Sequence, residues 1–181
     1  CKMRGWGLGP RSKDIFESID RRCDRNRIHL ENLAERIMMQ QFGDQVVVVT
    51  GGGAGIGRAT CLRFANAGAA VVVAEINEET GARTAADIVE AGGKSLFVQT
   101  DVSDESLIVS MVATATDAYG RIDILVNNAA IFVLKGIDAT VEDWRQILGV
   151  NVIGTALVAK HAVPEMRKVG GGAIINLASI S

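Results

Sequence analysis

Eight residues with the sequence TGGGAGIG, at positions 50–57, constrain the fold more than any other stretch. They follow the β-branched run DQVVVVT at 44–50, which predicts a strand that is buried on both faces. They lead into residues 55–68, whose apolar spacing and final Gly68 predict a helix. A glycine-rich turn between a buried strand and a helix is typical of a parallel sheet that helices cover on both faces.

The same alternation of strand and helix continues along the rest of the chain. Right-handed crossovers between such strands give a doubly wound parallel sheet of the α/β class, which is the fold that we predict. We expect the sheet to be truncated after its fifth strand, whose outer edge would be exposed and apolar. The expected strands are 44–50, 69–75, 94–101, 121–130 and 172–179, and the expected helices are 55–68, 77–93, 103–120 and 140–170.

Polar residues mark the starts of three of these helices. The side chains of Asn77, Ser103 and Thr140 can accept hydrogen bonds from backbone N–H groups of the first turn. We expect the last helix to break around Gly149–Asn151 and to be distorted at Pro164, which has no N–H to donate.

Three further residues of this last helix are given structural roles. We expect Trp144 and Ile147 to pack the helix against its neighbours rather than to contact a substrate. His161 is expected at the surface or at an interface, because the sequence shows no acidic partner for it.

Composition limits the class of protein. The chain has 181 residues, of which 48% are hydrophobic and 22% charged, with a net charge of −2, which is typical of one soluble globular domain. No apolar run reaches the ~20 residues that a membrane-spanning helix needs, so we expect no membrane segment. Cys1, Cys23 and Cys61 are too widely spaced to predict a metal site or a disulfide, which favours a cytoplasmic protein.

The first 40 residues differ from the rest. Residues 1–40 contain nine Lys/Arg and six Asp/Glu, whereas residues 41–181 contain ten and fifteen. The interleaved acids argue against a stripe that binds nucleic acid, so we interpret 1–40 as a loosely ordered polar extension. An alternative is that translation begins at Met38 or Met39 and the preceding residues are not native.

The glycine turn also predicts a ligand. Gly51 would allow the tight turn out of the strand, Gly55 would let backbone approach a pyrophosphate, and Gly57 would let the helix pack close to the sheet. Backbone N–H groups and the helix dipole at this N-terminus favour a phosphate. Glycine loops often serve only as turns, so the interpretation depends on the strand before and the helix after.

Glu75 ends the second expected strand, twenty residues beyond Gly55. A carboxylate there can accept hydrogen bonds from the hydroxyls of an adenine ribose and would repel a 2′-phosphate. No Lys or Arg in the turn or directly after Glu75 reverses that preference, so we expect NAD rather than NADP as the cofactor. The alternative is that Glu75 is only a solvated carboxylate at a strand end.

Five motifs occur along the chain in order: TGGGAGIG at 50–57, TDV at 100–102, NNAA at 127–130, NVIG at 151–154 and INLAS at 175–179. Together they resemble the short-chain dehydrogenase/reductase family over residues 44–181, and they imply its Rossmann-type sheet. Ala130 departs from the family pattern, which usually has glycine at this position. The added methyl group would tighten the nicotinamide side of the pocket without abolishing binding.

The resemblance implies an NAD-dependent oxidoreductase that transfers a hydride between its cofactor and a small-molecule secondary alcohol or ketone. It implies a catalytic Ser179, which would hydrogen-bond the substrate oxygen, and a catalytic Asn151, which would help to hold a proton-relay water. It also places Asp101 and Val102 at the adenine, and implies no metal. The expected cofactor-binding residues are Gly51, Gly53, Gly55, Ile56, Gly57, Glu75, Asp101, Val102, Asn128 and Ala129.

The family's acid–base tyrosine and its lysine, in a Tyr-x-x-x-Lys helix, have no counterpart here, because the one tyrosine of the sequence is Tyr119. A tyrosine with its ordinary pKa near ~10 needs a neighbouring cation to act at neutral pH. We therefore expect the chain to be the N-terminal part of an enzyme and to be inactive by itself. The resemblance implies that the full-length enzyme is a homo-oligomer.

Two interpretations of function stay open. Taken singly, Ser179 could cap a strand end, and Asn151, Asn127 and Asn128 could satisfy backbone groups. If the 181 residues are the complete protein, the chain would be a non-catalytic dinucleotide-binding module. A reading frame that continues past Ser181 and encodes Tyr-x-x-x-Lys would favour the enzyme.

Overall fold

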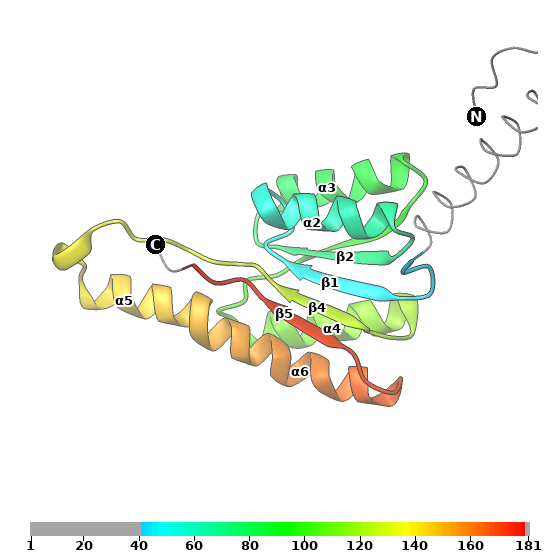
Figure 1. Cartoon of the computed structure of the whole chain (residues 1–181). Helices are drawn as coiled ribbons and strands as arrows, with labels where there is room; N and C mark the ends of the chain where they lie inside the picture. Colours follow the sequence, from blue (N-terminus) through cyan, green and yellow to red (C-terminus); the bar gives the residue numbers. More distant parts are fainter. Residues whose placement is uncertain (1–40, 180–181) are drawn as a thin grey trace, which may run out of the picture. The chain divides into compact units, whose positions relative to one another are not determined.

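The computed structural model describes residues 41–179, so the predictions for the 1–40 extension lie outside the described residues. A five-stranded parallel sheet in the order β3-β2-β1-β4-β5 forms its centre (Figure 1). The strands are β1 (Val46–Thr50), β2 (Ala70–Glu75), β3 (Lys94–Gln99), β4 (Ile124–Asn127) and β5 (Ala173–Asn176). The helices are α2 (Gly55–Asn66), α3 (Glu78–Glu90), α4 (Glu105–Tyr119), α5 (Val141–Leu148) and α6 (Thr155–Lys168), with a 3₁₀ turn η1 (Gly136–Asp138) and a π-helical segment η2 (Gly149–Gly154).

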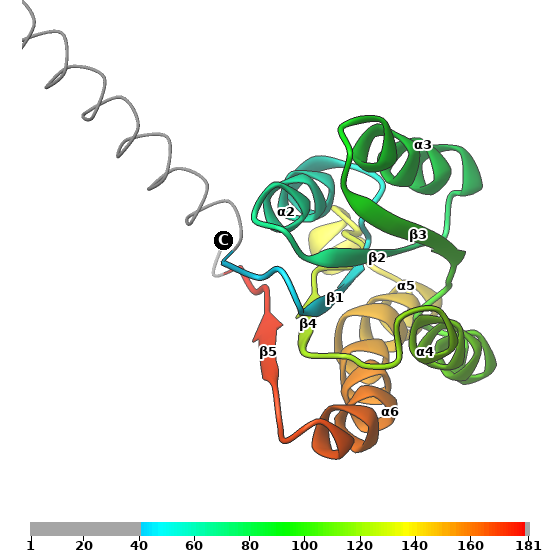
Figure 2. The same ribbon diagram turned by 90° about the vertical axis from the view of Figure 1, so that its right-hand side faces the viewer.

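The helices cover both faces of the sheet, with α2 and α3 on one face and α4 and α6 on the other (Figure 2). The chain builds β1, β2 and β3 outward in one direction and then returns to place β4 on the other side of β1. The strand order therefore reverses between β1 and β4. Ligands of doubly wound sheets bind at such a reversal, beyond the carboxyl ends of the strands. The predicted fold class is confirmed.

The central strand β1 explains why this sequence forms a sheet between two helix layers. Successive side chains of a strand point to opposite faces, so Val46 and Val48 join the core under α4 and α6. Val47 and Val49 join the core under α2 and α3. An unbroken run of β-branched residues thus supplies both cores at once, as expected for a strand buried on both faces.

The helix starts agree with two of the three predictions. Asn77 accepts a hydrogen bond from the N–H of Thr80, and Thr140 forms a reciprocal capping box with Asp143. The prediction for Ser103 is wrong, because Asp104 caps α4 and accepts from the N–H of Ser106. Ser103 instead donates both its N–H and its hydroxyl to Asp101.

The predicted break in the last helix is the π-helical segment η2, which joins α5 to α6 without a turn. Pro164 lies inside α6, and the helix continues past it to Lys168. Trp144 is about half exposed and Ile147 is half-buried, so their expected packing role stays a prediction. Figure 1 shows α5 and the segment before it extending away from the sheet.

One helical stretch of the described residues, Val141–Lys168, is long and apolar enough to cross a membrane, judged by length and composition alone. The core helix of a soluble protein passes the same test. Here α6 packs against α4 and β4, and its buried residues Val158, Ala162 and Met166 belong to the core under the sheet. These contacts favour a helix that packs on the sheet.

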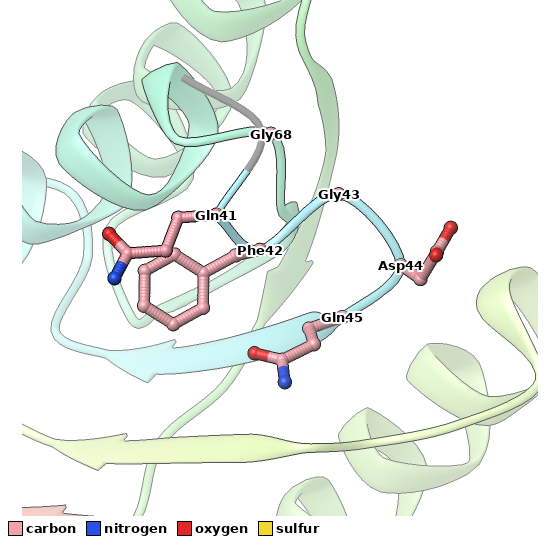
Figure 3. Close-up of a pocket in the computed structure, with 6 residues that line it drawn as sticks. All are labelled: Gln41, Phe42, Gly43, Asp44, Gln45 and Gly68. Atoms are coloured by element: carbon pink, nitrogen blue, oxygen red, sulfur yellow. The ribbon is translucent and has the colours of Figure 1, made fainter. Parts of the chain in front are cut away.

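Several motif residues lie beyond the strands rather than inside them. Strand β4 ends at Asn127 and β5 at Asn176, so NNAA and LAS continue as loops at the carboxyl edge of the sheet. As predicted, β5 is an edge strand with exposed apolar side chains, among them Ile174 and Ile175. At the amino ends of β1 and β2, a hollow of about 500 Å³ is surrounded by Gln41, Phe42, Gly43, Asp44, Gln45 and Gly68 (Figure 3).

Candidate functional site

The carboxyl ends of the parallel strands bring the motif residues to one edge of the sheet. The glycine turn follows β1, Glu75 ends β2, Asp101 follows β3, and Asn128 follows β4. Residues that lie far apart in the sequence therefore come to the same edge of the sheet, where ligands of doubly wound folds bind.

The glycines of the turn serve two different purposes. Gly51 has a φ of 65°, and a Cβ there would come within 2.9 Å of the Cα atom of Ala129, so this glycine lets two loops meet. Gly55 has a φ of 51°, and a Cβ there would meet no atom within 4 Å. Its backbone faces open space, which a ligand could approach.

Gly53 and Gly57 are packed rather than open. A Cβ on Gly53 would overlap the Thr80 hydroxyl and lie 2.8 Å from Cγ of Glu75, so helix α3 closes against the turn here. A Cβ on Gly57 would overlap the carbonyl oxygen of Gly51 and the amide of Asn128. Gly57 thus lets the helix approach the turn and the loop after β4, which is more specific than the predicted approach to the sheet.

The N-terminus of α2 suits an anionic group. Ala54, at its N-cap, provides no side-chain hydrogen bond, and the first turn contains no acid. Among the described residues, α3, α4 and α5 differ, because each begins with a side-chain cap and at least one acid in its first turn. Ile56 is exposed at the same end of α2. Uncapped N–H groups at a helix N-terminus match a pyrophosphate.

Glu75 is bound to the glycine turn. One carboxylate oxygen accepts from the N–H of Gly53 at 2.9 Å, and the other accepts from the N–H of Asn77 at 3.1 Å. A carboxylate has about four acceptor positions, so these two bonds leave others for a ligand. Glu75 is therefore held beside the turn, whereas the alternative interpretation predicts a side chain surrounded by water.

Thr50 connects the turn to the loop after β4, which the sequence reasoning missed. Its hydroxyl oxygen accepts from the N–H groups of Asn128 and Ala129, both at 3.1 Å. The side-chain amide of Asn128 donates back to the carbonyl oxygens of Thr50 and Gly51, both at 3.0 Å. Asn128 thus braces the turn, and Ala129 packs against Gly51. The only signal in the sequence was that Thr50 begins the glycine motif.

The loop after β3 presents Asp101 and buries Val102. One carboxylate oxygen of Asp101 accepts from the N–H and the hydroxyl of Ser103, at 2.8 and 2.7 Å. The side chain of Val102 belongs to the core, and its carbonyl oxygen would lie 2.7 Å from a Cβ on Gly154. Val102 is thus almost completely buried, and its predicted contact with the adenine stays a prediction.

Asn151 lies in the π-helical segment and holds the segment after β4. Its amide donates to the carbonyl oxygen of Ile131 at 2.9 Å and accepts from the N–H of Ile131 at 2.9 Å. The hydroxyl of Thr155 donates to the carbonyl oxygen of Asn151 at 3.0 Å. The prediction that Asn151 could satisfy backbone groups describes these contacts, and its catalytic role stays a prediction.

Ser179 follows β5 at the same edge of the sheet. The ladder between β4 and β5 ends at the pair Asn127 and Asn176, and the N–H of Leu177 then donates to the carbonyl oxygen of Asn127 at 3.0 Å. Ser179 is the last described residue and lies two residues further on, exposed. Strand β5, which leads to Ser179, is thus anchored to the end of β4, and Asn151 is anchored to the segment that follows β4.

Charged groups near the site are mostly paired. Lys135 donates to both carboxylate oxygens of Asp143 at 2.9 Å and, together with Thr140, lowers the pKa of Asp143 to about 2. His161, which we expected at the surface or at an interface, is partly exposed, and its Nε2 lies 2.7 Å from Oε1 of Glu105 on α4, an acidic partner that the sequence did not indicate. Hydrogen bonds from Lys160 and His161 lower the pKa of Glu105.

Two other titratable groups show no sign of chemistry. Burial raises the pKa of Cys61 to about 12, and its sulfur lies behind Gly52, where it fills the core. Burial also raises the pKa of Tyr119, at the end of α4. Among residues 41–179, no group of three or more His, Cys, Asp or Glu side chains could hold a metal ion.

Comparison with known proteins identifies the family to which the chain belongs. The family described as "short chain dehydrogenase" matches residues 45–181. A short-chain dehydrogenase/reductase of Aspergillus oryzae is 46% identical, covering 77% of this chain and 56% of that protein. A cyclopentanol dehydrogenase of a Comamonas species is 38% identical, covering 78% and 57%. A solved 7α-hydroxysteroid dehydrogenase, in complex with NADH and 7-oxo glycochenodeoxycholic acid, superposes with a TM-score of 0.75 and 32% identity, covering 80% of this chain and 56% of that one.

The chain spans about half the length of the curated relatives that it matches. Both the family match over residues 45–181 and the fold agree with the five ordered motifs. The chain belongs to the short-chain dehydrogenase/reductase family of oxidoreductases.

Proposed function

We propose that this chain is the dinucleotide-binding part of an NAD-dependent enzyme that interconverts a secondary alcohol and a ketone. The observation that carries the proposal is the Glu75 carboxylate bound at 2.9 Å to the N–H of Gly53, inside the glycine turn. It brings an acceptor for ribose hydroxyls next to a helix N-terminus suited to a pyrophosphate. When bound, the nicotinamide supplies the hydride acceptor or donor.

The chain's own residues bind and orient the cofactor in this proposal. The open backbone at Gly55 and the exposed N-terminus of α2 hold the pyrophosphate. Asp101 and the backbone of Val102 line the adenine side, and Ala129 the nicotinamide side. Glu75 selects NAD, because a 2′-phosphate would bring a second negative charge within a few ångströms of its carboxylate. Even at an effective dielectric near ~20, that repulsion amounts to a few kcal/mol.

We assign Ser179 the role of donating a hydrogen bond to the substrate oxygen. Asn151 orders the reaction centre by holding Ile131 at two points. During oxidation, the hydroxyl proton of the alcohol must leave as the hydride departs from the carbon. The family resemblance assigns that proton to a Tyr-x-x-x-Lys pair, which the 181 residues do not contain.

We further propose a hydroxyl on an aliphatic ring as the substrate group. The names of two relatives support it, since one is a cyclopentanol dehydrogenase and the other was solved with 7-oxo glycochenodeoxycholic acid. The segment that Asn151 holds also continues into strongly exposed apolar side chains, with Phe132 74% and Leu134 95% exposed. Apolar side chains beside the reaction centre suit a hydrocarbon ring.

The test uses the gene product that contains this chain, supplied with NAD or NADP and a panel of cyclic and open-chain secondary alcohols. We expect reduction of NAD, with cyclic alcohols preferred. Tight NAD binding without turnover on any alcohol or ketone would favour the alternative of a non-catalytic dinucleotide-binding module. A cytoplasmic location and a homo-oligomeric assembly are also part of the proposal and rest on the cysteine pattern and the resemblance.

A further inference from the structure

Asn127 is a buried polar residue at the last position of β4, only 5% exposed. Its amide nitrogen donates to Oδ1 of Asn176 on β5 at 2.9 Å and, at the longer distance of 3.5 Å, to the carbonyl oxygen of Thr155 on α6. One side chain thus touches the neighbouring strand and the helix below it.

The amide oxygen of Asn127 is buried and has no hydrogen-bond partner within residues 41–179. A buried acceptor without a partner lowers the free energy of unfolding, and an apolar side chain of similar size would avoid that cost. Groups that are costly to fold occur where a site requires them. The two hydrogen bonds that the amide nitrogen donates are therefore the reason that we infer for an asparagine at this position.

The contacts of Asn127 form part of a continuous polar chain across the candidate reaction centre. Asn176 is bound to Asn127, which is bound to Thr155, and the hydroxyl of Thr155 is bound to the carbonyl oxygen of Asn151. This series of hydrogen bonds starts at Asn176, three residues before Ser179, and ends at Asn151. It connects the segments that carry the two proposed catalytic residues.

The pair Asn127 and Asn176 is also the last rung of the ladder between β4 and β5. Beyond it, the N–H of Leu177 donates to the carbonyl oxygen of Asn127, and the backbone then leaves the sheet. This rung and the Leu177 bond therefore hold the backbone two to three residues before Ser179.

We propose that Asn127 and Asn176 are positioning residues, whose amide pair fixes the end of β5, and thereby Ser179, relative to Asn151. This inference rests on the proposed function. It differs from a merely structural role, because a structural role would affect the stability of the sheet but not the rate of a folded enzyme.

The test compares two substitutions in the gene product that contains this chain. Asn176→Asp keeps an oxygen that accepts from Asn127, whereas Asn176→Leu removes the acceptor. We expect Asn176→Leu to lower kcat by about tenfold to a hundredfold, since small displacements of reacting groups have effects of that size. Asn176→Asp should stay within about threefold of the unmodified protein, and both should bind NAD unchanged, because the glycine turn lies apart from β5.

Ile174→Ala provides the matched control. It removes apolar side-chain atoms from the same strand but leaves the amide pair in place, so kcat should be preserved even if the melting temperature falls. An unchanged kcat in Asn176→Leu, or equal losses of kcat in Asn176→Leu and Ile174→Ala, would overturn the positioning role. Absence of turnover in the unmodified protein would instead refute the proposed function, and with it any catalytic role of the pair.

Discussion

Glu75 combines two roles at the scale of a single residue: it braces the glycine turn and faces the proposed ribose. Replacing it with serine would remove both the charge and the brace, so Glu75→Gln is the cleaner change. We expect Glu75→Gln to narrow the preference for NAD over NADP by about tenfold or more, because the charge repulsion is lost. Adding Ile76→Arg should then favour NADP by pairing with its 2′-phosphate.

Dissociation constants for NAD and NADP, measured by titration calorimetry, check this prediction. Glu78→Gln is the control, because Glu78 begins α3 only three residues further on and makes neither bond to the turn. An unchanged ratio in Glu75→Gln, or an equal change in Glu78→Gln, would mean that Glu75 does not select the cofactor.

Gly55 and Gly92 allow backbone strain to be separated from ligand binding. Both have positive φ values, 51° and 85°, and a Cβ on either would meet no atom within 4 Å. Alanine at either position should therefore cost a similar ~1–2 kcal/mol of unfolding free energy. Only Gly55→Ala should also weaken NAD binding, because only this glycine lies in the proposed pyrophosphate site. Melting temperatures and NAD titrations of the two variants test this prediction. Equal dissociation constants for NAD in the two variants would show that Gly55 is not part of the pyrophosphate site.

Elements were predictable where their signals are local. Asn77 and Thr140 begin helices because a cap acts within its own turn. The bond between Glu105 and His161 was missed because it joins residues 56 apart and depends on how α4 crosses α6. The contacts of Thr50 and Asn127 were missed for the same reason. They join the ends of different strands, and a local sequence pattern does not show which strand ends lie side by side.

The start of α5 carries a prediction about pH. Lys135 and Thr140 hold the pKa of Asp143 at about 2, below the ordinary value of an aspartate. A lowered pKa in the folded state stabilises the protein above the unfolded pKa, near ~4, and this contribution is lost as the pH falls through the folded pKa. Asp143→Asn should therefore be less stable than the unmodified protein above pH ~4, and the difference should vanish toward pH ~2.

Urea denaturation of both proteins across this pH range measures the difference. Glu142→Gln serves as the control, because Glu142 lies next to Asp143 but, among residues 41–179, pairs only with exposed Arg145, at 3.6 Å. A stability difference for Asp143→Asn that does not depend on pH would show that the carboxylate charge contributes nothing to the start of α5.

At the scale of the whole molecule, residues 41–179 expose apolar side chains on the edge strand β5 and on α5 with the segment before it. Edge strands promote association because their backbone N–H and C=O groups can pair with another chain. We expect this 181-residue chain to associate through β5.

Ile175→Lys, on that strand, should slow aggregation several-fold, because charged edge residues prevent strand pairing. Val141→Lys introduces the same charge at a more exposed position of α5 and should have little effect. Light scattering against time at matched concentrations tests both, and suppression by Val141→Lys alone would show that α5, rather than the sheet edge, drives association.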